Sequence, residues 1–213
     1  VIRKVENPIF DKGSIAVLKG NLAPKSAIIK QSAASKELLA HEGIVEVFEN
    51  LEDLANRIDS DDLNVTKDSI LILKNIGPIG APGMPEAGLI PIPKKLAKQG
   101  VKDMVRISDA RMSGTSFGAC ILHVAPESYV GGPLSLLETG DIIEINVDLR
   151  SINMLVDEKT LLQRKKKVKK NNPKAGRGWL WMYSNHVRQA NDGCDFDFLE
   201  SDFGISAKEP DIF

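Results

Sequence analysis

The segment from Ile107 to Ala119, ISDARMSGTSFGA, concentrates the side chains that could do chemistry. It places the hydroxyls of Ser113, Thr115 and Ser116 in a glycine-punctuated turn between two apolar runs. The apolar runs predict short buried strands, and rigid strands fix the direction in which a reactive oxygen points. The turn is therefore the candidate site of catalysis.

Ser113 lacks the surroundings of the usual nucleophilic serines. The nucleophile elbow of α/β-hydrolases needs glycine two residues before and two residues after the serine, and neither position is glycine here. A catalytic triad needs a base, but His41, His123 and His186 are each better explained as structural residues, and His123 lies inside an apolar strand. The remaining chemistry is a serine that loses its proton with help from a nearby metal ion, because a cation lowers the pKa of a bound hydroxyl.

A loop from Asn75 to Gly88 supplies the carboxylate that such a metal ion would need. The loop is too rich in Gly and Pro for regular structure. It could cradle a phosphate through its backbone N–H groups, but it lacks the Gly-Lys-Ser/Thr ending of a P-loop, which argues against a nucleotide site. Glu86 is its single carboxylate, and a rigid loop could present it to a cation. A purely structural role for Glu86 is the alternative.

Two charge clusters are better explained by solvation than by binding. Acidic residues between 52 and 62 lie on the outer face of an expected helix and in the turn after it, so we assign them no metal. Basic residues between 164 and 170 lie at the end of another expected helix, where cations are stabilising. Because a nucleic-acid site needs interleaved aromatic residues or a broader basic surface, we expect no nucleic-acid partner.

The composition indicates a protein with a real core and a small partner. A chain of 213 residues can bury roughly 70% of its unfolded surface. Its 28 basic and 29 acidic residues give a net charge of -1, so nucleic acid and anionic membranes are not favoured. Cys120 and Cys194 lie far apart without metal-ligand spacing, and we expect free thiols in a cytoplasmic protein. No apolar run approaches the ~20 residues that span a bilayer, and an upstream targeting signal stays open because the chain begins at Val1.

The hydrophobic pattern predicts more strands than helices. Strands are expected at 15–18, 27–30, 44–48, 69–74, 104–107, 120–124, 143–147 and 151–155. Helices are expected at 36–41, 51–58, 93–99 and 157–170. We treat 1–213 as a single domain in which 157–213, with both tryptophans, is a helical, aromatic-containing tail packed on the rest. The fold class is α+β, with a strand-rich, barrel-like sheet and flanking helices.

Five ordered segments resemble the C-terminal half of the dihydroxy-acid and sugar-acid dehydratases, and the resemblance covers essentially the whole chain. They are Gly20-Asn21-Leu22-Ala23-Pro24, Gly83-Met84-Pro85-Glu86, Ser108-Asp109-Ala110-Arg111-Met112-Ser113-Gly114-Thr115, His123-Val124-Ala125-Pro126-Glu127 and Gly131-Gly132-Pro133. The branch of the family that acts on branched-chain dihydroxy acids has Gly and Phe where this chain has Ala110 and Met112. Those two residues and the tail at 193–199 resemble the sugar-acid branch, which implies an aldonic acid such as arabinonate or xylonate.

The resemblance also implies a mechanism and a fold. Magnesium would bind the substrate carboxylate and C2 hydroxyl, an iron–sulfur cluster would act as Lewis acid on the C3 hydroxyl, and an ionised serine would remove the C2 proton. Water would leave, and the resulting enol would tautomerise to a 2-keto-3-deoxy acid. Carried over by motif, Ser113 is the catalytic base, Thr115 binds the substrate and Glu86 is a metal ligand. The implied domain is a swivelling β/β/α barrel that closes over a larger N-terminal domain.

The implied cofactors need residues beyond those of this chain. In the family the cluster cysteines and the other magnesium ligands belong to an N-terminal domain, and two separated cysteines cannot supply the thiolates of a cluster. We therefore expect the chain alone to be inactive, with its own N-terminal domain and further copies in a homo-oligomer as partners. The alternatives are a branched-chain dihydroxy-acid dehydratase and a non-catalytic swivelling domain that binds a ligand or partner.

Overall fold

The computed structural model of the chain describes residues 2–8, 12–168, 171 and 175–199. Within these residues, the strands are β1 (Ile15–Leu18), β2 (Ser26–Lys30), β3 (Ala40–Phe48), β4 (Ile70–Leu73), β5 (Arg106–Ser108), β6 (Cys120–Ala125), β7 (Ile142–Asn146) and β8 (Ser151–Met154). The α-helices are α1 (Leu51–Arg57), α2 (Lys94–Lys98), α3 (Glu158–Lys167) and α4 (Gly178–His186). Short 3-10 helices complete the described elements: η1 (Gln31–Ala33), η2 (Lys36–Leu38), η3 (Ser128–Val130), η4 (Pro133–Leu136), η5 (Ala190–Asp192) and η6 (Asp197–Leu199).

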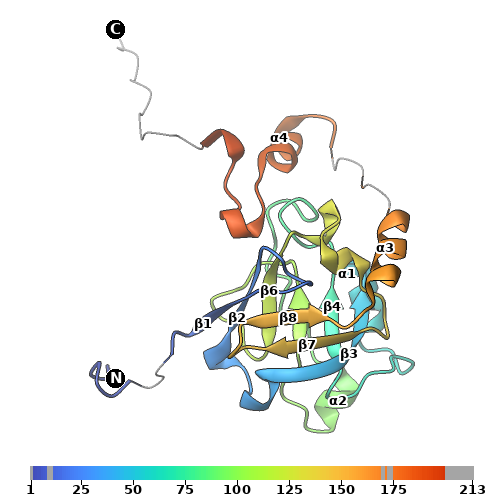
Figure 1. Cartoon of the computed structure of the whole chain (residues 1–213). Helices are drawn as coiled ribbons and strands as arrows, with labels where there is room; N and C mark the ends of the chain where they lie inside the picture. Colours follow the sequence, from blue (N-terminus) through green and yellow to red (C-terminus); the bar gives the residue numbers. More distant parts are fainter. Residues whose placement is uncertain (1, 9–11, 169–170, 172–174, 200–213) are drawn as a thin grey trace.

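All the described strands form one sheet in the order β1-β2-β6-β5-β4-β3-β7-β8. The four central strands β6, β5, β4 and β3 run parallel, and the strands on either side pair antiparallel. The two edges of the sheet approach each other at Lys19, whose N–H donates to the Arg150 carbonyl over 2.9 Å and whose carbonyl accepts from Ile152 N–H over 3.1 Å. The sheet is thus a nearly closed barrel (Figure 1), which confirms the expected strand-rich α+β fold.

The segment after Lys19 completes this closure. A Cβ atom on Gly20 would lie 1.9 Å from the Ile152 carbonyl oxygen, so only glycine fits there. The side chain of Asn21 then bonds both backbone groups of Met154, accepting from its N–H over 2.6 Å and donating to its carbonyl over 2.9 Å. The Gly20-Asn21 pair therefore joins β1 to β8 in place of a continuous ladder.

The parallel strands are buried on both faces, as β4 shows. Ile70 and Ile72 belong to the apolar cluster that fills the barrel. Leu71 and Leu73 belong to a second cluster outside it, which includes Leu54 of α1 and other side chains from the flanking helices. Burial on both faces explains why β4 is a continuous apolar run instead of an alternating one.

Two segments differ from the sequence expectation. The helix expected at 36–41 is only the 3-10 turn η2, because β3 already begins at Ala40 and pairs with β7 from Ala40 opposite Asn146 to Ile44 opposite Ile142. The strand expected at 104–107 begins only at Arg106, so β5 is three residues long. In both cases the element begins where the chain pairs with a neighbouring strand of the sheet, and local sequence pattern does not specify that position.

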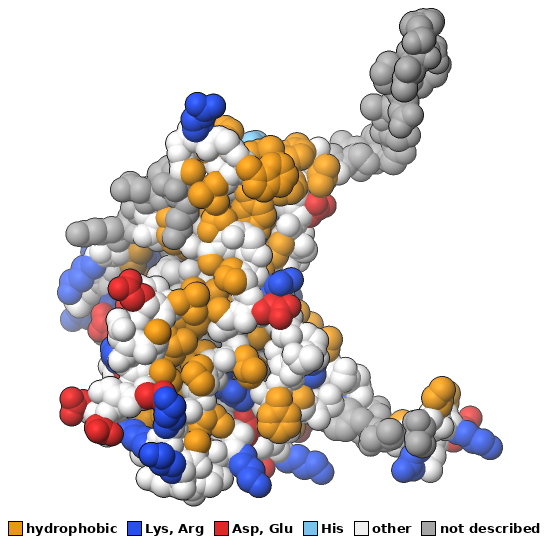
Figure 2. All heavy atoms as spheres, turned by 180° about the vertical axis from the view of Figure 1, so that it is seen from behind, with side chains coloured by type: hydrophobic (Ala, Val, Ile, Leu, Met, Phe, Trp, Pro, Cys, Tyr) orange, Lys and Arg blue, Asp and Glu red, His pale blue; other side chains and the backbone are white. Residues whose placement is uncertain are grey.

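The tail lies at one end of the barrel, with α4 above the sheet in Figure 1. Its aromatic rings contact one another: Phe196 lies edge-on to Tyr183 and stacks on Phe198. Trp179 remains 72% exposed and Trp181 42% exposed, and α4 has no buried residue. Hydrophobic side chains accordingly gather at this end of the surface in Figure 2. The part of the expected tail at 200–213 lies outside the described residues.

Across the described chain, no helix combines the length and apolarity that crossing a membrane requires.

Candidate functional site

The Ser113 turn and the Glu86 loop leave the sheet at the same end of the parallel strands, the carboxyl end. β4 and β5 are parallel neighbours, with Leu73 paired to Ser108 at their carboxyl ends. The loop that carries Glu86 follows β4, and the turn that carries Ser113 follows β5. Ligands of open α/β sheets bind outside the carboxyl ends of parallel strands, so the topology places both candidate segments where a site is expected.

The hydroxyls of Ser113 and Thr115 lie together. Their oxygen atoms are 3.0 Å apart, and the backbone N–H of Thr115 donates to Ser113 Oγ over 3.2 Å. Lys30 Nζ donates to the carbonyl of Gly114 over 2.7 Å, which holds the turn against β2 and brings a cation next to it. Donors and positive charge near an oxygen favour its ionised form, so this turn suits a serine that must lose a proton.

The far end of the turn is anchored in the sheet by a buried ion pair. Arg106 Nη2 donates to Asp103 Oδ1 over 3.0 Å and to the Phe117 carbonyl over 3.0 Å. Asp103 Oδ1 also accepts from Ala119 N–H over 2.9 Å. Gly118 has a φ of +84°, and a Cβ atom there would lie 2.2 Å from the Arg106 and Asp103 side chains. The return of the chain from the turn into β6 is therefore fixed.

Glu86 contacts the turn by an ion pair with Arg111. Arg111 Nη2 lies 3.3 Å from Glu86 Oε1, and the two side chains are about half exposed, at 49% and 48%. An exposed ion pair of this kind contributes little to stability, so Glu86 can exchange Arg111 for another cation at low cost. The structure thus brings Glu86 to the residue two positions before Ser113, and it places Glu86 on the surface instead of in a closed cage.

Asp109 is a buried carboxylate directly after β5. Its side chain accepts from Ile76 N–H over 2.9 Å, from Ser128 N–H over 2.8 Å and from the Ser128 hydroxyl. Burial raises its pKa, while the hydrogen bonds from Ser128 and Ile76 act in the opposite direction. Asp109 therefore ties the start of the Glu86 loop to the strand that leads into the Ser113 turn.

Glu127 holds the same loop from the other side. Its carboxylate accepts from Ile79 N–H over 3.0 Å, Gly80 N–H over 2.8 Å and Gln189 Nε2 over 2.8 Å. A Cβ atom on Gly77 would lie 2.5 Å from the Glu127 side chain, which explains a glycine there. Burial raises the pKa of Glu127, and the bonds from Gly80 and Gln189 lower it. Gly77 thus makes room for a buried carboxylate, which occupies the Ile79 and Gly80 N–H groups that a phosphate would otherwise need.

Sequence reasoning missed Asp109 and Glu127 as organising residues. Both lie inside the motifs quoted for the family resemblance, but only Ser113, Thr115 and Glu86 were assigned roles. A signal was present, because each carboxylate lies within two residues of the end of a buried strand, where an isolated charge needs hydrogen-bond donors. The identity of those donors was not readable, since they come from residues 33 and 48 positions away in the sequence.

The described residues fit a magnesium ion only in part and do not fit an iron–sulfur cluster. Nowhere in the described chain do three His, Cys, Asp or Glu side chains come together as a metal site. Glu86 supplies one carboxylate, the ligand type that magnesium prefers. Cys120 and Cys194 are both free, and burial raises the pKa of each thiol, which is the opposite of what a thiolate ligand needs.

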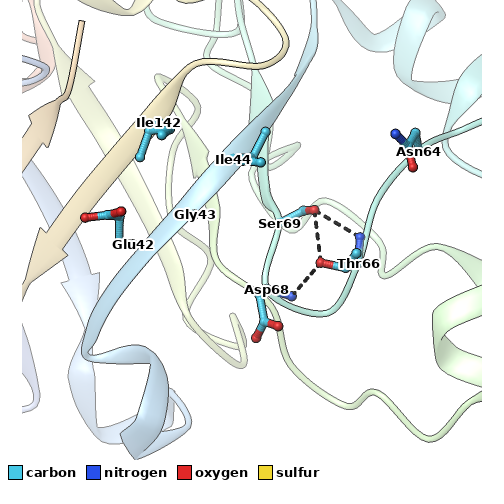
Figure 3. A pocket seen from close by; sticks show the side chains of 8 residues that line it. All are labelled: Glu42, Gly43, Ile44, Asn64, Thr66, Asp68, Ser69 and Ile142. Carbon is cyan, nitrogen blue, oxygen red and sulfur yellow. Dashed lines mark hydrogen bonds between the residues drawn. The ribbon is translucent and has the colours of Figure 1, made fainter.

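A polar hollow lies away from this site, at the opposite end of the parallel strands. Residues of β3, β7 and the 64–69 segment line it, and Ser69 immediately precedes β4 (Figure 3). Thr66 N–H donates to Ser69 Oγ over 3.0 Å, and Asp68 N–H donates to Thr66 Oγ1 over 3.3 Å. These bonds close the 66–69 turn on itself and occupy the Thr66 and Ser69 hydroxyls, and we assign the hollow no ligand.

The fold is a barrel-like domain that carries a serine turn and a carboxylate loop at the carboxyl ends of two neighbouring parallel strands. The chain belongs to the family described as "Dihydroxy-acid/6-phosphogluconate dehydratase C-terminal", whose model matches residues 1–194. This confirms the resemblance seen in the sequence.

Named relatives come from both branches of the family. The chain is 48% identical to a 6-deoxy-6-sulfo-D-gluconate dehydratase of Pseudomonas putida, covering 100% of this chain and 37% of the relative. It is 46% identical to an L-arabonate dehydratase of Azospirillum brasilense and 39% identical to a dihydroxy-acid dehydratase of Carboxydothermus hydrogenoformans, covering 93% and 92% of this chain and 35% of each relative. The chain thus spans little more than a third of the length of these relatives.

Proposed function

We propose that the chain is the serine-bearing part of a hydro-lyase that dehydrates an aldonic acid to a 2-keto-3-deoxy acid. The observation that carries the proposal is the pairing of the Ser113 and Thr115 hydroxyls at the sheet edge that Glu86 also reaches. Membership of the dehydratase family supports the reaction class. The branched-chain dihydroxy-acid reaction is the rival within that class, and a non-catalytic swivelling domain is the rival outside it.

Ser113 Oγ takes the proton from substrate C2 in this proposal. The N–H of Thr115 already donates to that oxygen, so negative charge on it would be stabilised without movement of the turn. The Thr115 hydroxyl is exposed beside it and can bond a substrate hydroxyl, which orients the C2–H bond toward Ser113. Lys30 fixes the turn through the Gly114 carbonyl.

Glu86 would hold a magnesium ion together with ligands outside this chain. When bound, magnesium would supply positive charge that polarises the substrate hydroxyls and lowers their pKa. The iron–sulfur cluster implied by the resemblance has no fitting residues in the described chain, so we derive no step through it. Arg111, displaced from Glu86, would remain a cation at the edge of the site for an anionic substrate.

An aldonic acid is preferred over a branched-chain acid because of the residues around the turn. Ala110 and Met112, the two residues that resemble the sugar-acid branch, lie on either side of Arg111 in the segment that leads to Ser113; Ala110 is fully buried and Met112 is half-buried. Relatives named for sugar acids are 46% and 48% identical to the chain, whereas the dihydroxy-acid relative quoted above is 39% identical. Turnover of a pentonate should therefore exceed turnover of a branched dihydroxy acid.

The test is Ser113→Ala in an enzyme that joins this chain to the N-terminal portion found in its relatives. We expect turnover of the pentonate to fall by at least about 10³-fold, with metal content and fold unchanged, because the proton acceptor is lost. Ser116→Ala is the matched control: its hydroxyl lies on the same turn, buried and with no hydrogen-bond partner among the described residues. A near-normal rate for Ser113→Ala would remove Ser113 from the role of base.

A further inference from the structure

His123 interrupts β6 with a bulge. Leu122 pairs with Ile28 of β2 and Ala125 pairs with Ser26, so two residues of β6 lie opposite one residue of β2. His123 has a φ of +55°, in the left-handed region. That conformation costs a non-glycine residue on the order of 1–3 kcal/mol, and bulges of this kind re-aim a side chain. The strain calls for a reason in what the ring contacts.

The ring and backbone of His123 both bond the chain just before Ser113. The His123 N–H donates to the Ala110 carbonyl over 2.9 Å, and the Met112 N–H donates to His123 Nε2 over 2.8 Å. A backbone amide can only donate, so Nε2 carries no proton and the ring is the neutral Nδ1–H tautomer. Because of the bulge, His123 makes two hydrogen bonds to the 110–112 segment, one through its backbone N–H and one through its ring.

We infer that His123 is a positioning residue for Ser113: its neutral ring accepts the Met112 N–H and thereby fixes the turn in which the proposed base stands. The inference rests on the proposed function for its catalytic consequence, and on the bulge and two hydrogen bonds for its geometry. The role differs from that of a triad histidine, because the ring contacts a backbone N–H and not the serine hydroxyl.

The surroundings of the ring keep it neutral. Burial and the positive charge of Arg111 both lower the pKa of His123 below its usual value. Ala27, the β2 residue opposite the bulge, carries no charge, and Asp109 on the neighbouring segment is occupied by Ile76 and Ser128. The Met112 bond is therefore present at neutral pH and is lost as pH falls through the lowered pKa, because an imidazolium has no acceptor.

Nitrogen NMR of the 213-residue chain tests the geometry without any reaction. We expect His123 Nε2 to show the shift of an unprotonated nitrogen at pH 8, and the Met112 amide to move with the His123 ring in a titration whose midpoint lies below 6.5. In His123→Gln, whose amide oxygen replaces Nε2, the Met112 amide should not titrate. A proton on Nε2 at pH 8, or a Met112 amide that ignores the ring, would overturn the inference.

Kinetics of the joined enzyme test the consequence. His123→Leu removes the acceptor and should lower kcat by on the order of 10²-fold with little change in KM, since a small misplacement of a reacting group has that effect. His123→Gln keeps the acceptor and should retain most of kcat. Equal losses in the two variants, or no loss in either, would overturn the positioning role. Failure of the proposed function would instead appear as a normal rate for Ser113→Ala.

Discussion

Asp109 and Glu127 show how single residues organise this site. Each carboxylate is almost fully buried, and each accepts hydrogen bonds from backbone N–H groups of the Glu86 loop. Neither touches the Ser113 hydroxyl in the described contacts. Their role is to fix one segment against another, and burying a charge for that purpose is tolerated only because every carboxylate oxygen has donors.

Glu127→Gln tests this role. One carboxylate oxygen becomes an NH₂ group that faces a backbone N–H or the Gln189 amide, so a buried donor loses its partner. We expect the free energy of unfolding to fall by about 1–3 kcal/mol in urea titrations. Glu144→Gln, on an exposed position of β7, is the control and should stay within about 0.5 kcal/mol. Equal stability of the two variants would contradict the role of Glu127.

At the scale of elements, the barrel depends on how β1 meets β8. Lys19 makes two backbone bonds to the Arg150–Ile152 segment, Gly20 allows the close approach, and Asn21 continues the connection through its side chain. The same barrel aligns the carboxyl ends of β4 and β5, from which both candidate segments emerge. The strands that close the barrel and the strands that carry the candidate site therefore belong to the same sheet.

Gly20→Ala tests the closure. The added Cβ atom would lie 1.9 Å from the Ile152 carbonyl oxygen, a backbone atom that cannot rotate away. We expect a loss of about 1–3 kcal/mol in the free energy of unfolding, as for other overpacked sites. Gly13→Ala is the matched control, because its nearest neighbour, the Ile15 carbonyl oxygen, lies 3.9 Å from an added Cβ. If Gly20→Ala lowered the free energy of unfolding no more than Gly13→Ala does, the contact between β1 and β8 would not contribute to stability.

At the scale of the molecule, the proposed function makes this chain one part of a site. The Ser113 turn is exposed at a sheet edge, and Glu86 is a single carboxylate beside it. The relatives are nearly three times as long as the stretch they share with this chain. Exposed aromatic side chains of α4 and a half-exposed metal-ligand candidate are both consistent with a surface that meets further protein.

The 213-residue chain by itself should show no dehydration of a pentonate and no visible-range absorption from an iron–sulfur cluster, because its two thiols are separate and held protonated by burial. Assays of turnover and absorbance on the purified chain, reconstituted with iron and sulfide, check this. The joined enzyme treated in the same way is the positive control. Turnover by the isolated chain would contradict a divided site.

The sequence by itself determined the strand-rich α+β fold and the family, because alternating and continuous apolar runs encode strands and five ordered motifs encode ancestry. It also singled out Ser113, Thr115 and Glu86, whose roles stay predictions. Only the tertiary structure decided that Asp109 and Glu127 fix the Glu86 loop and that a bulge in β6 directs the His123 ring to accept the Met112 N–H. These contacts join residues distant in sequence, and their partners are backbone N–H groups, which every residue except proline carries and no sequence pattern can distinguish.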